Sequence, residues 1–171
     1  RRAHKLQVAE AHYFSKWYMP AIRELVSLKM FKNDPKWIAN ALKPKISAGE
    51  AEKALDVLRK LGMLKVDASG QLKQSDAIVT TGPETANVHM AEYHRSMMKQ
   101  ASDAIDAFSA VQRDISSLTF GISASGLERC KQRLQQFRQE LLRMSACEKD
   151  VEQVVQINMQ LFPLSEKKDG K

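Results

Sequence analysis

The sequence predicts a mostly helical α+β protein, in which a winged helix-turn-helix is followed by a C-terminal α-β-α-β domain. Three observations lead to this prediction. A capped amphipathic helix at residues 47–61 ends at a glycine and precedes a predicted hairpin. Two shorter helical segments come before it. Further along the chain, two helical segments are each followed by a stretch in which apolar and polar residues alternate.

The helix predicted at residues 47–61 defines the first domain. Ser47 and Glu50 have the S-x-x-E spacing of a capping box, in which each side chain accepts a hydrogen bond from the other residue's backbone amide. Gly62 ends the helix, and strands at 63–66 and 71–79 then flank the turn residues 67–70. Apolar residues recur at intervals of three and four, which predicts one buried face: Ala51, Ala54, Leu55, Leu58 and Leu61.

Residues 1–45 supply the helices that precede the recognition helix in a winged helix-turn-helix. Residues 1–29 are predicted to be helical, with a break before Pro20, because proline removes a backbone donor. Pro35 suits the first position of a short helix that ends before Pro44. Helix, short helix, turn, capped helix and hairpin then account for residues 20–82 as a winged helix, within a first domain at residues 1–82.

Gly82-Pro83 marks the predicted boundary to a second domain at residues 83–165, which serves dimerisation or sensing. Helices are expected at 84–113 and 125–146, the latter opened by a second capping box of Ser125 and Glu128. Strands are expected at 118–123 and 155–161, and residues 166–171 are predicted to be a disordered tail. The second helix has an apolar seam that is expected to pack along the first helix: Leu127, Cys130, Leu134, Phe137, Leu141 and Met144.

The two predicted strands need further partners. Joined across helix 125–146, they can pair in parallel through a right-handed crossover, but a two-stranded sheet is marginal alone. A second copy of the chain, the hairpin, or missing N-terminal sequence could cover the sheet edges. We favour a homodimer. The chain starts Arg1-Arg2 rather than with Met, which suggests a fragment of a longer protein.

The net charge of +7 lies entirely in the first half of the chain. Residues 1–82 hold 15 basic and 8 acidic residues, whereas residues 83–171 hold 12 of each. A basic field confined to one domain favours an anionic partner, and for a winged helix the commonest is double-stranded DNA. A solvated surface that keeps the protein soluble explains the charge equally well.

The sequence contains no motif for catalysis or cofactor binding. Phosphate-binding, dinucleotide-binding, hydrolase and zinc-protease motifs are absent. Cys130 and Cys147 lack zinc-site spacing, and His89 and His94 are five positions apart, which turns them away from each other on a helix. We therefore expect no enzymatic activity, no cofactor and no metal site. No apolar run could span a membrane and no signal peptide is found, so a cytoplasmic location is expected.

If the first domain binds DNA, the start of its helix 47–61 faces the bases and nearby lysines hold phosphates. Three acids, Glu50, Glu52 and Asp56, lie on or beside this reading face and would weaken binding to a phosphate backbone. The predicted DNA-binding residues are Lys43, Lys45, Ser47, Lys53, Lys65 and Lys73.

The acids leave a second interpretation open. A non-enzymatic protein-interaction or scaffold module, whose winged helix does not read DNA, would have the same pattern. A third possibility is a small-molecule sensor, which would need an enclosed apolar pocket between the helix of Met97 and Met98 and the two predicted strands.

Four segments resemble a bacterial family of uncharacterised candidate transcriptional regulators, which is catalogued through a C-terminal domain of unknown function. The segments are YFSKWYMPAIRELV at 13–26, IANALKPKISAGEAEKALDVLRKLGML at 38–64, QRDISSLTFGIS at 112–123 and VVQINMQLFPLS at 154–165. The most specific parts are Trp17-Tyr18-x-Pro20-Ala21-Ile22 and Gln160-Leu161-Phe162-Pro163. Family members typically carry a further N-terminal segment resembling a helix-turn-helix. The resemblance implies a regulator, with no ligand and no functional residue to carry over.

Overall fold

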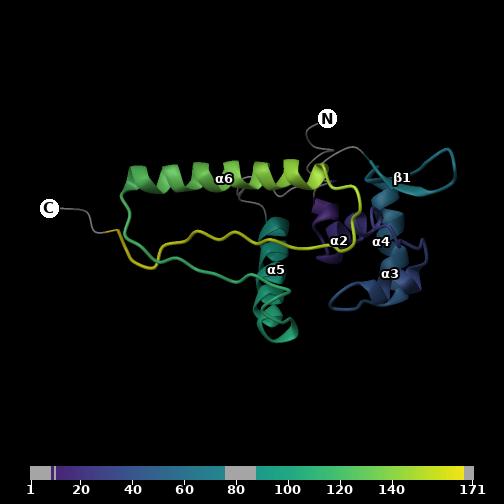
Figure 1. Cartoon of the computed structure of the whole chain (residues 1–171), viewed down its shortest axis with the longest axis horizontal. Helices are drawn as coiled ribbons and strands as arrows, with labels where there is room; N and C mark the ends of the chain where they lie inside the picture. Colours follow the sequence, from purple (N-terminus) through teal and green to yellow (C-terminus); the bar gives the residue numbers. More distant parts are fainter. Residues whose placement is uncertain (1–8, 10, 76–87, 168–171) are drawn as a thin grey trace.

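Three helices and a hairpin form the N-terminal module of the protein (Figure 1). The computed structural model describes residues 9, 11–75 and 88–167. In chain order the module contains α2 (Tyr18–Leu25), α3 (Pro35–Ala41), α4 (Ala48–Lys60), β1 (Leu64–Val66) and β2 (Leu72–Gln74). α4 is central, because α2, α3 and β1 all pack against it. The predicted α+β, mostly helical fold class is confirmed.

Local sequence signals set the ends of these helices. Asp34 caps α3 by accepting hydrogen bonds from the backbone amides of residues 36 and 37, both at 3.2 Å, and Pro35 takes the first helical position. Ser47 and Glu50 form the predicted capping box of α4. Gly62 follows α4 with a φ of 73°, a left-handed conformation that suits glycine. The chain can therefore reverse directly into β1.

The hairpin is antiparallel and pairs Leu64 with Gln74, Lys65 with Lys73, and Val66 with Leu72. Directly paired residues lie on the same face of a sheet. Leu64 and Leu72 are buried on one face, so the two lysines point to the opposite, exposed face. The predicted second strand, 71–79, is shorter in the structure, and its residues 76–79 lie outside the described residues.

A single hydrophobic core unites the module with the first part of the second half. Tyr13, Ile22, Ile38 and Leu58 are its largest fully buried side chains. Helix α5 (Val88–Ala107) adds a stripe of three buried residues to the same core: Met90, Tyr93 and Met97. The predicted boundary at residues 82 and 83 lies outside the described part of the chain, as do residues 168–171 of the predicted tail.

The α-β-α-β prediction for the second half is wrong in its strands. Residues 114–123 and 151–163 are irregular and extended, and no ladder joins them in the described chain. In the sequence, one segment precedes helix α6 (Ala124–Ala146) and the other follows it. The two segments run in the same general direction, as parallel strands joined by a crossover helix would (Figure 1). The alternating apolar pattern predicted strands, but neither segment has a hydrogen-bonded partner strand among the residues that the structure describes.

Helix α6 also differs from its prediction. Ser123, not Ser125, is the N-cap, and its hydroxyl oxygen accepts from the amide of Gly126 at 3.0 Å. α6 runs across the top of α5 rather than packing along it (Figure 1). Gly126 is buried beneath Ile122, whose Cγ1 would lie 2.6 Å from a Cβ added at this glycine. A larger residue at this position would displace the Ile122 side chain from the first turn of α6.

Candidate nucleic-acid interface

The turn before α4 brings together three of the predicted DNA-binding residues. Lys43 and Lys45 are exposed in the connection between α3 and α4, and Ser47 follows at the N-cap. The Ser47 Oγ accepts from the Glu50 amide at 3.1 Å, and it donates to the Glu50 carboxylate at 2.9 Å. The Ser47 amide donates to the same carboxylate at 2.8 Å. The hydroxyl and amide of Ser47 are thus engaged inside the capping box.

Glu50 places a fixed negative charge at the start of α4. The hydrogen bond from the Ser47 amide, followed by that from its hydroxyl, lowers the pKa of this carboxyl below its usual value. The nearby Lys16 and Lys53 ammonium groups lower the pKa further. Glu50 is therefore ionised at neutral pH. Its negative charge interacts favourably with the dipole of α4 but would repel a phosphate group at this point.

Replacing Ser47 with alanine is expected to reduce the free energy of unfolding by about 1 kcal/mol, because an N-terminal donor of α4 loses its acceptor. The pKa of Glu50 should also move up toward its ordinary value as the hydroxyl donor is lost. Since the folded-state pKa is lowered, the carboxylate contributes stability above its unfolded pKa and loses it as the pH falls through the folded pKa. Urea unfolding and an NMR titration of Glu50 would measure both changes. Ser109→Ala, an exposed serine outside the module, is the control and should leave both values unchanged.

The hairpin presents two lysines side by side. Lys65 and Lys73 are direct cross-strand neighbours on its exposed face. Like charges in this arrangement repel, so an anion bound over both lysines would relieve the repulsion. Asp67, in the turn, accepts from the Ser69 hydroxyl at 2.6 Å and from the Gln71 amide at 2.9 Å. These hydrogen bonds, in that order of effect, lower the Asp67 pKa, and Lys73 lowers it further, so an ionised acid lies beside the two lysines.

A buried polar network fixes the hairpin to α2. Arg23 is only 4% exposed, and its guanidinium donates to the Ser75 carbonyl at 2.9 Å and to the Glu24 carboxylate at 2.7 Å. The Gln74 side-chain amide donates to the Arg23 carbonyl at 2.8 Å and to the Glu24 carboxylate at 3.0 Å. The orientation of the lysine-bearing face is therefore set by contacts with the first helix of the module.

The exposed side of α4 carries mixed charge. Glu52, Lys53 and Asp56 are all exposed, and Asp56 forms an ion pair with Arg59 at 3.6 Å. Bidentate contacts to bases are made mostly by Arg, Asn and Gln, and none of these occupies the first two turns of α4. The positive groups that can contact an anion are therefore concentrated in the turn and in the hairpin rather than on the helix between them.

Lys43 has a structural contact that the sequence did not indicate. Its Nζ lies 5.5 Å from the centroid of the Phe108 ring, within the range of a cation–π interaction. Phe108 directly follows α5, far away in the sequence, so no local pattern could predict the pair. The contact ties the turn between α3 and α4 to the end of α5.

Five of the six predicted residues form two separate groups. Lys43, Lys45 and Ser47 lie at the start of α4, whereas Lys65 and Lys73 lie beyond its end (Figure 1). Lys53, the sixth, lies on the exposed side of α4 between the two groups. The 13 residues of α4 separate the groups by about 20 Å. A major groove is about 12 Å wide, so groups at this separation can reach phosphates on both of its sides.

Other site types receive no support from the described chain. It has two open hollows, one at Phe14, Trp17 and Tyr93 and one along Arg129 and Arg133 of α6, and neither is lined by Met97 or Met98. Within residues 9, 11–75 and 88–167, no three His, Cys, Asp or Glu side chains are grouped as metal ligands. None of the described helices combines the length and the apolar character that a membrane crossing needs.

Comparison with known proteins identifies a family but no activity. A family model described as "Domain of unknown function (DUF4423)" matches residues 1–164. No curated protein and no solved structure matches the chain. The match confirms the predicted relation to a family defined by a domain of unknown function, and the regulatory role implied by the resemblance stays a prediction.

Proposed function

We propose that the chain, which belongs to the DUF4423 family of domains of unknown function, is a transcriptional regulator that binds double-stranded DNA through a winged helix at residues 20–82. The order of α2, α3 and α4, followed by the β1–β2 hairpin, supports the proposal because a winged helix-turn-helix has its elements in this order. The excess charge of +7 falls in the same half of the chain. The second half serves dimerisation or sensing, and the protein acts in the cytoplasm.

The observation that carries this proposal is the lysine pair of the hairpin. Lys65 and Lys73 lie opposite each other on an exposed face, and the Arg23 network holds that face in a fixed orientation. A wing in this position can place both ammonium groups on one phosphate backbone. The turn lysines at the other end of α4 supply a second backbone contact.

The composition of α4 predicts that the protein discriminates only weakly between DNA sequences. Contacts to phosphate fix the position of a protein on DNA but do not distinguish sequences. The exposed side of α4 carries two acids, Glu52 and Asp56, and the basic side chain nearest to the start of the helix is Lys53. The module on this proposal binds chiefly through backbone contacts, and its affinity should fall steeply with salt.

Charge reversal of the hairpin tests the proposal. Lys65→Glu combined with Lys73→Glu should weaken binding to duplex DNA roughly 10- to 100-fold at low salt and reduce the salt slope by about 2, because two phosphate contacts are lost. Fluorescence anisotropy with a labelled duplex at two salt concentrations measures both quantities. Lys43 stays unchanged in this test because its ammonium contacts Phe108.

The matched control is Lys149→Glu combined with Lys167→Glu, which changes the net charge equally at two exposed positions outside the module. It should bind like the parent chain. If neither the parent nor the control binds DNA at low salt, or if both double variants lose affinity to the same extent, the proposed interface is wrong.

One observation favours the second candidate, a protein-interaction or scaffold module. Glu50 and Asp67, at the two ends of the surface that would face DNA, are both held in the ionised form by hydrogen bonds. Such acids would favour a partner protein with basic side chains over a phosphate backbone. Stable capture of a protein by the full chain, without any DNA binding at low salt, would support this candidate.

A further inference from the structure

The chain beyond the middle of α5 has almost no core of its own. Among residues 98–167, all of which the structure describes, Gly126 alone is buried. Ordering a residue costs about 1–2 kcal/mol of backbone entropy, which burial of apolar surface normally offsets. A helix and two extended segments held in this form therefore need apolar contacts beyond those that the described residues of one chain supply.

Helix α6 exposes the apolar seam that the sequence predicted. Phe137 is 50% exposed and Met144 is 60% exposed, although both belong to a regular three-and-four spacing. Leu134 and Leu141, in the same seam, are only partly buried. This spacing is the one that packs one helix along another, and α5 does not fill that role. The seam of α6 is thus available to a helix from outside the chain.

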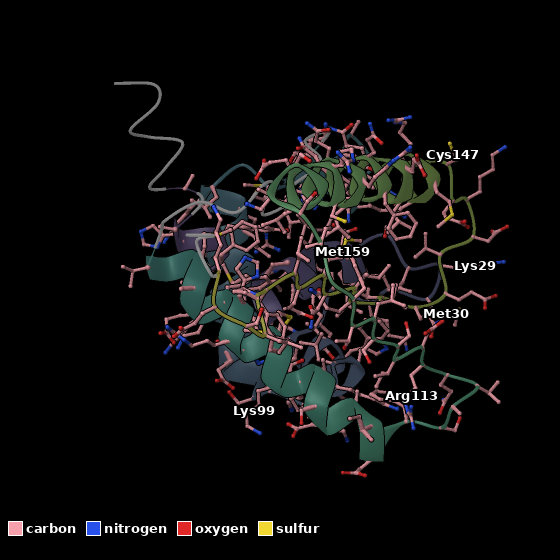
Figure 2. The ribbon with its side chains drawn as sticks, turned by 90° about the vertical axis from the view of Figure 1, so that its left-hand side faces the viewer. Lys29, Met30, Lys99, Arg113, Cys147 and Met159 are labelled. Atoms are coloured by element: carbon pink, nitrogen blue, oxygen red, sulfur yellow. The ribbon has the colours of Figure 1, made fainter. Side chains whose placement is uncertain are left out.

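The two extended segments are also exposed. In residues 114–123, Leu118 is 89% exposed and Phe120 is 57% exposed, and in residues 151–163, Val155 is 68% exposed. The described residues of both segments form no strand ladder, so their backbone groups, other than the Val151 carbonyl that accepts from the Lys29 amide, can pair with added strands. Figure 2 shows Met159, from the second segment, beneath α6.

The chain exposes more surface than a compact monomer of the same mass would. The whole chain exposes 13403 Å². A compact monomer of its mass, 19.3 kDa, would expose about 8500 Å². Interfaces of obligate homodimers bury about 2000 to 5000 Å² in total, so the excess is large enough for one. Within the described residues, the exposed large apolar side chains are concentrated in 98–167.

We infer that α6 and the segments 114–123 and 151–163 form an arm that a second copy of this chain covers, with the extended segments completing a sheet between the two copies. A second copy fits because it brings the same free helix seam and the same unpaired segments. Charge also permits it, since residues 114–163 hold 6 basic and 6 acidic residues and the arm itself carries no net charge.

This dimer does not rest on DNA binding. The lysine-bearing hairpin belongs to the module at the opposite end of the molecule from the free end of the arm (Figure 1). The arm can therefore be tested without any nucleic acid, and a failure of DNA binding leaves the inference unaffected.

The test compares the full chain with two double variants by sedimentation velocity and light scattering at micromolar concentrations. The parent chain should have twice the mass of 19.3 kDa. Phe120→Glu combined with Phe137→Glu should be monomeric or dissociate at least about 100-fold more readily, because both charges enter the apolar interface. Val66→Glu combined with Val88→Glu, at exposed apolar positions outside residues 98–167, is the matched control and should stay dimeric.

Hydrogen exchange provides a second measurement, which is made on the parent chain and so does not require any variant to fold. In the parent chain, amides of residues 116–122 and 152–158 should exchange slowly at high concentration and lose this protection on dilution. A parent chain that is monomeric at every concentration overturns the inference and assigns the arm to a different protein. A dimer that the arm variant leaves intact, or free exchange of both segments in the dimer, overturns it as well.

Discussion

Leu58→Ala should lower the free energy of unfolding by about 3 to 5 kcal/mol, the upper part of the range for a buried leucine. Leu58 is fully buried on the face of α4 that belongs to the shared core. Its removal leaves a cavity in the centre of the module, where α2, α3 and β1 all meet α4. Urea unfolding followed by far-UV circular dichroism measures the loss.

The control for this prediction is Leu164→Ala, the same substitution at a residue that is 75% exposed. It should change stability by no more than about 0.5 kcal/mol, because few contacts are lost at an exposed position. If both leucine variants are equally stable, α4 is not the central element of the core.

Arg23→Ala should have the second largest effect, a loss of about 2 to 3 kcal/mol in the free energy of unfolding. The guanidinium bridges the Glu24 carboxylate and the Ser75 carbonyl from a buried position. This loss is smaller than that of about 3 to 5 kcal/mol for a fully buried pair, because Glu24 is itself half exposed and can be hydrated. Hydrogen exchange should show faster exchange in β2 than in α4, since the hairpin loses its attachment to α2.

Arg59→Ala is the matched control for Arg23. Arg59 pairs with Asp56 on the exposed side of α4, and surface pairs of this kind contribute about 0 to 1 kcal/mol. Equal losses for the two arginine variants, or unchanged exchange in β2 of Arg23→Ala, would contradict the role of the network as the anchor of the hairpin.

The parts of the fold that were predictable depend on local signals. The capping box of Ser47 and Glu50, the glycine stop at Gly62 and the hairpin after it are encoded within a few residues of one another. Their energetics need only short-range hydrogen bonds and one apolar face. The sequence could therefore place α4, β1 and the lysines of the hairpin close to where they lie in the structure.

The remaining features depend on contacts between distant residues. Alternation in the segments 114–123 and 151–163 is present, but a strand also needs a partner, and alternation carries no information on whether the same chain supplies it. The start of α6 was misplaced by two residues because Ser123 and Ser125 are both suitable caps. The contacts of Lys43 with Phe108 and of Arg23 with Ser75 join positions that no periodic pattern connects.

The contacts of residues 151–158 with the rest of the molecule have a consequence for protein synthesis. The Lys29 amide donates to the Val151 carbonyl at 3.1 Å, and the Asn158 side chain donates to the Met97 carbonyl at 2.9 Å. Val154, between them, packs against the shared core. Figure 2 shows Cys147, at the end of α6, on the same side of the molecule as Lys29 and Met30. Because a chain leaves the ribosome N-terminus first, this side of the core stays uncovered until residues 151–158 have emerged.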